Sequence, residues 1–188
     1  MSKRVFDVVV SIMLLLFLFP LMLLIAFLVK ATSKGPVIFR QERVGLHGTP
    51  FTILKFRTME HGSERPLDMV TYGDTRITKA GRFLRSMHLD ELPQLINVFR
   101  GEMSIVGPRP FRVCTIQRWC EKIPNFNQRH MARPGMTGPT QIFGRVAVQS
   151  AMEQAASFEL AYVRKHNFSD DMRIIIKTIP IILKGKGI

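Results

Sequence analysis

The stretch SMHLDELPQLINVFRGEMSIVGPRP, Ser86 to Pro110, constrains both the fold and the chemistry of this chain. It sets two adjacent carboxylates, Asp90 and Glu91, among residues that are mostly apolar or cationic. Apolar side chains then recur at helical spacing, and Pro93 is tolerated only in the first turn of a helix. The pattern predicts a helix over 90–99 that begins at the carboxylate pair.

A carboxylate pair at the start of a helix has a structural and a chemical interpretation. Acidic residues favour the first turn because they offset the helix dipole, and this needs no function. The same end of a helix attracts phosphate, and an aspartate can attack a phosphate whose charge is neutralised by cations. Residue chemistry leaves both interpretations open. The cations available for the second one are Lys55, Arg57, Arg85, Arg109 and Arg145.

The N-terminal segment is predicted to enter a membrane. Val8 to Val29 holds 22 residues without a charge, and a helix of that length reaches ~33 Å, enough to cross a bilayer. Cationic residues flank the run at both ends, although cations prefer the cytoplasmic side. Pro20, near the midpoint, would kink the helix. A re-entrant helix that enters and leaves on one face accounts for both features, and a tilted single span is the alternative.

The charge balance narrows the class of partner. The chain has 27 Lys and Arg against 14 Asp and Glu, a net charge of +13. Such a surplus suits nucleic acid, an acidic membrane leaflet or a phosphorylated substrate. The membrane segment favours the last two, and no nucleic-acid-binding motif is found. Cys114 and Cys120 form neither a disulfide framework nor a zinc spacing, which fits a reducing cytosolic environment.

The remaining ~150 residues suit one compact domain. We expect α+β structure, mainly helical with short strands. Residues 60–76 read as a loop, and 173–184 as a segment too short to span a membrane, either lying on its surface or docked on the core. Strands are predicted over 37–44, 51–56 and 103–106, and helices over 79–87, 90–99, 111–122, from a capping box at Ser150 and Glu153 to 166, and from Ser169 onward.

Common catalytic motifs are missing from the sequence. No GxxxxGK[ST], GxGxxG, GxSxG or HExxH pattern occurs, and the five histidines are scattered. A hydrolase triad or a zinc centre therefore has little support.

Five motifs carry a family resemblance: GPVIFRQERVG, LKFRTM, LDELPQL, GEMSIVGPRP and RPGMTG, in this order behind a proline-broken apolar helix. In this combination the chain resembles the bacterial sugar transferases and, more narrowly, the monotopic phosphoglycosyl transferases. The resemblance runs from about Lys3 to Thr178. It matches the minimal catalytic domain, without the additional membrane helices of longer relatives.

The resemblance implies a reaction. A sugar 1-phosphate would pass from a UDP-sugar to undecaprenyl phosphate with release of UMP and a requirement for Mg²⁺, as the start of exopolysaccharide, O-antigen, capsule or glycoprotein assembly. Asp90 would be the nucleophile, would form a covalent phosphosugar intermediate and would lie beside the metal. Glu91 would deprotonate or position the lipid phosphate. The substrate phosphates would bind Lys55, Arg85 and Arg109, and the nucleotide Arg145.

The resemblance also implies a place in the cell, the cytosolic face of the bacterial inner membrane. Residues 1–34 would form the re-entrant helix with its flanks, and 35–188 a single cytosolic catalytic domain with a membrane-associated C-terminal helix. Three positions depart from the family pattern. Phe19 stands where a small polar residue often precedes the proline. Pro139 replaces the tryptophan of the TGWAQV segment, and Phe143 replaces the asparagine before the GR that follows it. The sugar, the glycan and the choice between monomer and homodimer stay open.

A non-enzymatic hypothesis makes the chain a membrane-tethered basic module that binds acidic lipid or nucleic acid. Such a module would keep its function after Asp90→Asn. A transferase would lose both turnover and the covalent adduct.

Overall fold

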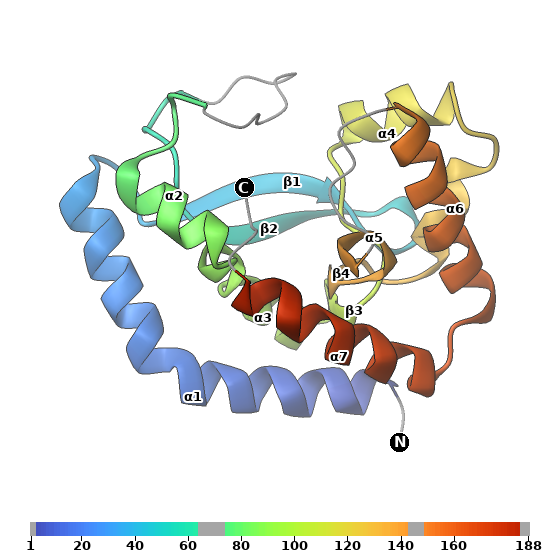
Figure 1. Ribbon diagram of the computed structural model, residues 1–188, viewed down its shortest axis with the longest axis horizontal. Coiled ribbons are helices and arrows are strands. Elements are labelled where there is room, and N and C mark those ends of the chain that lie inside the picture. Colours follow the sequence, from blue (N-terminus) through green and yellow to red (C-terminus); the bar gives the residue numbers. More distant parts are fainter. Residues whose placement is uncertain (1–2, 64–73, 143–148, 185–188) are drawn as a thin grey trace.

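The computed structural model describes residues 3–63, 74–142 and 149–184. Helices surround two small sheets of two strands each, which confirms the expected mainly helical α+β structure (Figure 1). The elements in chain order are α1 (Lys3–Thr32), β1 (Ile38–Val44), η1 (Leu46–Gly48), β2 (Pro50–Phe56), α2 (Lys79–Ser86), η2 (Leu89–Glu91), α3 (Gln94–Arg100), β3 (Ser104–Val106), α4 (Val113–Cys120), η3 (Phe126–Met131), β4 (Gly135–Thr137), α5 (Pro139–Ile142), α6 (Gln149–Lys165) and α7 (Phe168–Leu183), where η marks a 3₁₀ helix.

The first sheet is the predicted hairpin. β1 and β2 pair antiparallel, with Ile38 opposite Phe56 and Val44 opposite Pro50. The connection includes His47 in the left-handed region at φ 54°, a conformation that favours a turn over a continued strand.

The second sheet joins the two glycine-proline motifs. β3 and β4 are parallel, with Ser104 opposite Gly135. The backbones approach so closely that a Cβ atom on Gly135 would lie 2.1 Å from the Gly107 nitrogen. Glycine is required here for lack of space, and its effect is to fix the segment that carries Arg109 against β4.

Helix α1 is bent. Figure 1 shows two arms that meet near the middle of the helix, and Pro20 lies near the midpoint of Lys3–Thr32. Proline cannot donate the backbone hydrogen bond to the preceding turn and its ring crowds that turn, which accounts for a kink.

The first turn of α1 is anchored by buried polar contacts. Asp7, 2% exposed, accepts hydrogen bonds from the Ser104 hydroxyl at 3.1 Å and the Ile105 N–H at 3.0 Å. Arg4 donates to the carbonyls that end α3, and Lys3 pairs with Asp171 of α7. These contacts hold the beginning of α1 against β3, α3 and α7.

The last turns of α1 are anchored to the same body. Ile25 and Val29 form a buried cluster with Phe56 of β2 and Leu84 of α2. Arg57, 4% exposed, donates hydrogen bonds to the carbonyls of Ser33 and Pro36 and so fixes the chain just after the helix. Both ends of the long helix therefore pack against the rest of the described chain.

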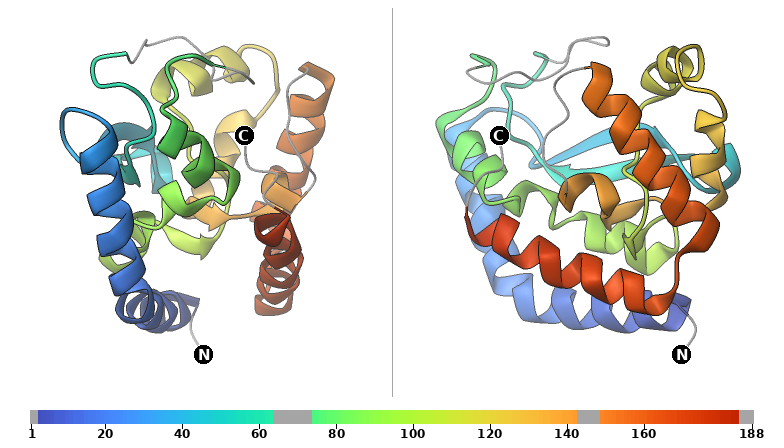
Figure 2. Two further views of the ribbon diagram at one scale, coloured as in Figure 1. Left: turned by 60° about the vertical axis from the view of Figure 1, so that its left-hand side comes forward. Right: turned by 45° about the vertical axis from the view of Figure 1, so that its right-hand side comes forward.

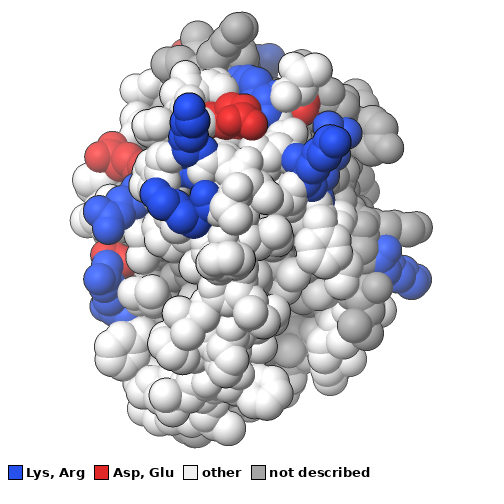
Figure 3. Space-filling model, turned by 90° about the vertical axis from the view of Figure 1, so that its left-hand side faces the viewer, with Lys and Arg blue, Asp and Glu red and all other residues white. Residues whose placement is uncertain are grey.

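The middle of α1 is exposed and apolar. Only 11% of its most apolar 18-residue stretch is buried within the protein. A core helix of a soluble protein would be mostly buried. Figure 3 shows the described charged side chains across the top and along the edges of the face drawn there, and none at its bottom. The most exposed apolar side chains of the helix are Met13, Leu16, Phe17, Leu24 and Phe27.

Helix α7 lies on the same side of the molecule as the first arm of α1 (Figures 1 and 2). The two meet where Phe6 and Phe168 pack edge to face, with ring centroids 5.3 Å apart. Ile174 of α7 is buried in the main core, whereas Ile176, Ile179 and Ile182 are exposed. One stripe of α7 is docked on the core and another is left apolar and uncovered.

Two sequence predictions are corrected in detail. Asp90 and Glu91 lie in the separate turn η2, and α3 begins only after its N-cap Pro93. Ser150 is not a cap, because α6 already begins at Gln149. The remaining predicted helices and strands lie within a few residues of their expected positions.

Candidate active site

The carboxylate pair lies on a tight turn between α2 and α3. His88 adopts a left-handed backbone at φ 56° and reverses the chain. The N–H of Glu91 then donates to the His88 carbonyl at 3.2 Å. Because the two carboxylates are adjacent on a 3₁₀ turn, their side chains leave it in different directions and enter different surroundings.

Glu91 is surrounded by cations. Its Oε1 atom lies 2.5 Å from the Lys55 ammonium and 3.5 Å from the Arg109 guanidinium. Burial opposes the ionisation of Glu91, but the charges of Lys55 and Arg109 outweigh it and lower the pKa to about 2. Glu91 is therefore a fixed anion that gathers two cations around it.

Asp90 has the opposite electrostatic setting. It is 7% exposed, and burial raises its pKa to about 6, helped by the Glu91 charge and opposed by Lys55 and Arg85. A carboxylate with this pKa is mostly ionised at neutral pH, yet it is poorly solvated. Perturbed pKa values of this kind are concentrated at functional sites, which makes Asp90 a candidate catalytic group.

Asn97 docks the helix that follows this turn onto the first sheet. Its side-chain oxygen accepts from the Leu54 N–H at 3.0 Å, and its amide donates to the Thr52 carbonyl at 2.8 Å. The residue is fully buried. These bonds fix α3 against β2, which brings the turn with Glu91 to Lys55.

Arg85 reaches the pair from the α2 side. Its Nε donates to the Thr58 hydroxyl at 2.7 Å. Thr58 in turn accepts the N–H of Thr78, the N-cap of α2, through its carbonyl. The position of Arg85 is thus set by the segment that follows β2.

A shallow pocket opens beside Glu91, and sequence reasoning missed one of its cations. Arg43 of β1 lines the pocket together with Lys55 and Arg109. Burial, then the nearby charges of Arg109 and Arg112, lower the Arg43 pKa to about 10. The Nε atom of Arg43 is buried and has no hydrogen-bond partner among the described residues. Three cations around one carboxylate leave a net positive charge in the pocket, which a bound anion could balance.

The structure thus divides the predicted site residues into groups. Lys55, Glu91 and Arg109 line one pocket, whereas Asp90 is not on its wall and interacts electrostatically with Arg85 and Lys55. Arg57 holds the chain after α1 and is not at the pocket. Arg145 and Phe143 lie outside the described residues.

The donor set for a metal is small. In the described ranges, no three His, Cys, Asp or Glu side chains are grouped so as to hold an ion. The site offers carboxylates and cations side by side, which suits phosphate chemistry.

These features combine a buried carboxylate, a neighbouring pocket lined by cations and a long helix with an exposed apolar middle. The family profile described as bacterial sugar transferase matches residues 1–185. The chain belongs to the bacterial sugar transferase family.

Named relatives are similar over nearly the whole chain. A UDP-glucose:undecaprenyl-phosphate glucose-1-phosphate transferase of Caulobacter vibrioides is 41% identical, covering 97% of this chain and 70% of the relative. A protein of the same name from Escherichia coli is 41% identical over 94% of this chain but 39% of its own length. An undecaprenyl-phosphate galactose phosphotransferase of Salmonella typhimurium is 38% identical over 98% of this chain and 41% of its own length. The chain spans well under half of these last two.

Proposed function

We propose that this protein transfers a sugar 1-phosphate from a UDP-sugar to undecaprenyl phosphate, releases UMP and so starts the assembly of a surface glycan. The observation that carries the proposal is the buried Asp90–Glu91 pair beside a cation-lined pocket, in a chain of the bacterial sugar transferase family. The names of the relatives supply the substrate classes.

The donor diphosphate would extend from the pocket of Arg43, Lys55 and Arg109 toward Asp90, which lies outside that pocket next to Glu91. Its charge would be matched there by two guanidinium groups and one ammonium. Forked guanidinium groups hold a phosphate through two oxygens, which fixes orientation as well as charge. Arg85, on the α2 side of Asp90, would take the phosphate of the lipid, because α2 contacts α1.

Asp90 would carry the sugar phosphate. Its carboxylate oxygen attacks the phosphorus that bears the sugar, and the bond from this phosphorus to the oxygen of UMP breaks. UMP leaves with that oxygen and its electron pair. An oxygen of the lipid phosphate then attacks the same phosphorus and frees the Asp90 carboxylate.

Glu91 would position groups rather than move a proton. A pKa of about 2 makes it a weak base, and a base works best with a pKa near the working pH. Its contacts support a role in holding Lys55 and Arg109 in place.

Magnesium fits this donor set. Mg²⁺ is commonly bound through one or two carboxylates together with substrate phosphates, and Asp90 beside the diphosphate would provide such ligands. When bound, the metal supplies Lewis-acid compensation of the phosphate charge.

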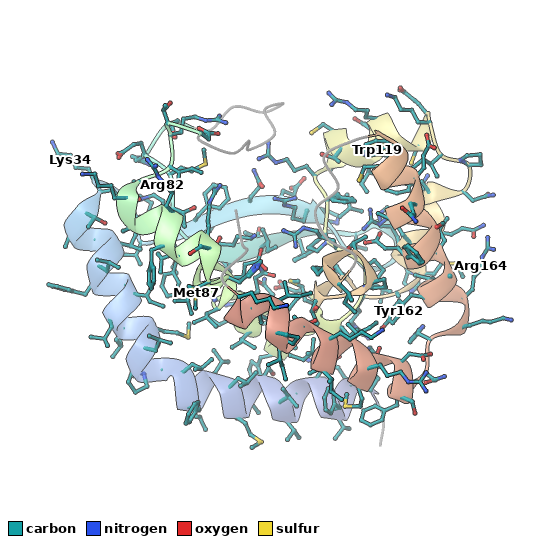
Figure 4. All side chains as sticks on the ribbon, viewed as in Figure 1. Lys34, Arg82, Met87, Trp119, Tyr162 and Arg164 are labelled. Carbon is teal, nitrogen blue, oxygen red and sulfur yellow. The ribbon has the colours of Figure 1, made fainter. Side chains whose placement is uncertain are left out.

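We further infer that α1 is re-entrant, with the catalytic domain on the cytosolic face. The two anchored ends, the central bend and the exposed apolar middle support an entry and exit on one side. Lys34 and Arg82 point away from the protein beside the end of α1 and would meet the headgroups (Figure 4). The exposed stripe of α7 would lie along the membrane surface.

The test is nucleotide release. Purified protein is mixed with UDP-glucose, UDP-galactose or UDP-N-acetylgalactosamine, undecaprenyl phosphate and Mg²⁺, with Asp90→Asn as the matched control. We expect UMP release that requires the lipid for turnover and is lost in the variant. A phosphosugar adduct on the wild type, absent from Asp90→Asn by intact mass, would identify the nucleophile.

Release of UDP instead of UMP would mean ordinary glycosyl transfer and would overturn the proposal. Full activity in Asp90→Asn would also overturn the mechanism.

A further inference from the structure

The backbone of Arg109 is held from both sides by one buried ion pair. The N–H of Arg109 donates to Glu159 Oε1 at 2.9 Å. The carbonyl of the same residue accepts a hydrogen bond from Arg129 Nη2. Glu159 is on α6 and Arg129 on η3, so two elements distant in sequence meet at one peptide segment.

The two side chains also bind one another. Arg129 Nη2 lies 2.6 Å from Glu159 Oε2, and each side chain is 2% exposed. The guanidinium carbon of Arg129 lies 4.3 Å from the ring centre of Phe111 and 4.8 Å from that of Phe126. Phe111 follows the Gly-Pro-Arg-Pro segment directly. This stacking therefore adds a third contact to the two hydrogen bonds that hold the segment.

Glu159 is fully used as an acceptor. Besides the Arg109 N–H, its Oε1 accepts the hydroxyl of Thr140 at 3.1 Å, while Oε2 faces Arg129. A glutamine in its place would have one oxygen and one NH₂ group. It could accept on one side only, and its NH₂ would face another donor on the other side.

Stability alone is a poor reason for this pair. Removing two charges from water is costly, and well-packed apolar residues in place of a buried ion pair are often as stable or more so. Here both charged groups reach the main chain of the residue whose side chain lines the anion pocket. The arrangement fixes the direction from which the Arg109 side chain leaves the backbone.

We infer that Arg129 and Glu159 are positioning residues for Arg109, clamping its main chain so that its guanidinium meets the phosphates of the donor. This inference rests on the proposed function, because it assigns Arg109 to the donor diphosphate. Neither clamp residue touches the substrate.

The experiment is a double-mutant cycle. Glu159→Gln and Arg109→Met are made singly and together, and UMP release is measured as kcat and KM, with Tm for each variant. We expect Glu159→Gln to lower kcat/KM on the order of 10²-fold, since a small misplacement of a substrate-binding group has an effect of that size. In the Arg109→Met background, Glu159→Gln should lower kcat/KM less than about threefold, because the guanidinium that the clamp positions is then absent. The fall in Tm should be the same in both backgrounds.

Asp171→Asn is the matched control. Asp171 is the acidic partner of another ion pair, with Lys3, and its side chain is hydrogen-bonded to Lys3 and Tyr162 and not to the main chain of Arg109. Asp171→Asn should lower kcat/KM by the same factor in the wild type and in Arg109→Met, as expected for independent sites. If Glu159→Gln also lowers kcat/KM by the same factor with and without Arg109, the ion pair is purely structural and the inference is wrong.

A second variant covers a failure of Glu159→Gln to fold. Arg129→Lys keeps the charge next to Glu159 but loses the planar guanidinium that stacks on Phe111 and Phe126 and whose Nη2 also reaches the Arg109 carbonyl. It should show the same dependence on Arg109. The wild-type arm separates the two proposals. Lack of UMP release by folded wild-type protein refutes the proposed function, whereas wild-type turnover without coupling refutes the clamp alone. The cycle can also be run on UDP affinity by calorimetry, with the same expected coupling.

Discussion

At the scale of single residues, two neighbouring carboxylates have opposite electrostatic surroundings. Asp90 and Glu91 follow one another in sequence, yet burial raises the pKa of the first to about 6, whereas Lys55 and Arg109 overcome burial and lower that of the second to about 2. Pairs of titratable groups pushed apart in this way commonly mark a division of labour at an active site.

Arg43 gives the first prediction. Arg43→Gln removes a buried cation from the pocket while keeping a side chain of similar length. Hydrogen bonds to charged groups contribute about 1.5–3 kcal/mol, so we expect a loss of about 10- to 100-fold in kcat/KM, mainly through KM for the UDP-sugar. Steady-state UMP release measures it, with Arg40→Gln on the exposed face of the same strand as control. An unchanged KM would exclude Arg43 from donor binding.

His130 gives a prediction for stability against pH. Burial and the Arg129 charge lower its pKa from 6.5 to about 4. Between these values the unfolded chain binds a proton that the folded protein resists, so the unfolding free energy should fall as pH falls from about 6.5 to 4. Denaturant unfolding of the wild type and His130→Gln across this window should show a flatter dependence in the variant. If the unfolding free energy of both proteins depended on pH in the same way, the lowered pKa of His130 would be contradicted.

At the scale of elements, periodic patterns were readable from sequence and long-range pairing was not. The β1–β2 hairpin, β3 and α4 were predicted because turn residues and apolar alternation are local signals. The turn η2 was not, because the left-handed His88 starts a separate turn and the capping Pro93 separates Asp90 from α3. The pattern of apolar residues continues across that break and hides it.

The clamp of Arg129 and Glu159 is a further example of long-range pairing that local sequence does not predict. Arg129 and Glu159 are 30 positions apart in sequence, and nothing local marks either one as the partner of Arg109. Asp7 has the same character, a lone acid before an apolar run whose partners lie in β3. In contrast, the LDELPQL and GPRP motifs led to Glu91 and Arg109, which the structure places 3.5 Å apart.

Gly135 gives a prediction for the second sheet. A methyl group there would lie 2.1 Å from the Gly107 nitrogen, so the Arg109 segment would have to move. Overpacking of this kind costs about 1–3 kcal/mol, and we expect Gly135→Ala to lower Tm and reduce UMP release at least tenfold. Gly62→Ala is the control, because its φ of +79° brings backbone strain but no neighbour lies within 4 Å. Equal activity of the two variants would contradict the prediction.

Pro20 gives a prediction for α1. Pro20→Ala restores a backbone donor, and a straight helix of 30 residues would be about 45 Å long. We expect part of the population to span the membrane, so that an N-terminal tag becomes open to protease from the periplasmic side of spheroplasts. Leu21→Ala should leave the tag protected. Protection of the tag in Pro20→Ala would show that the anchored ends alone impose the bend.

At the scale of the whole molecule, charge and apolar surface are segregated. Exposed apolar side chains gather on the middle of α1 and along α7, whereas the described charges on the face in Figure 3 lie apart from them. A net charge of +13 would draw anionic substrates and lipid, but attachment would depend on the apolar surface.

Membrane attachment gives the last prediction. In about 1 M NaCl the Debye length is about 3 Å, so purely electrostatic attachment is lost. We expect the protein to stay in the membrane pellet after such a wash. Phe17→Asp with Leu24→Asp should release a large fraction without lowering the Tm measured in detergent. Release of the wild type by salt would contradict an inserted helix.

The anchors of α1 have a consequence for the order in which the protein is made. The Asp7 carboxylate meets the Ile105 N–H across 98 positions, and Lys3 meets Asp171 across 168. The apolar helix therefore leaves the ribosome long before the residues that hold its first turn exist. Contacts so distant in sequence form late in folding. A nascent helix that reached lipid at this stage would carry a free Asp7 side chain, and its first turn would be fixed only after Asp171 had been made.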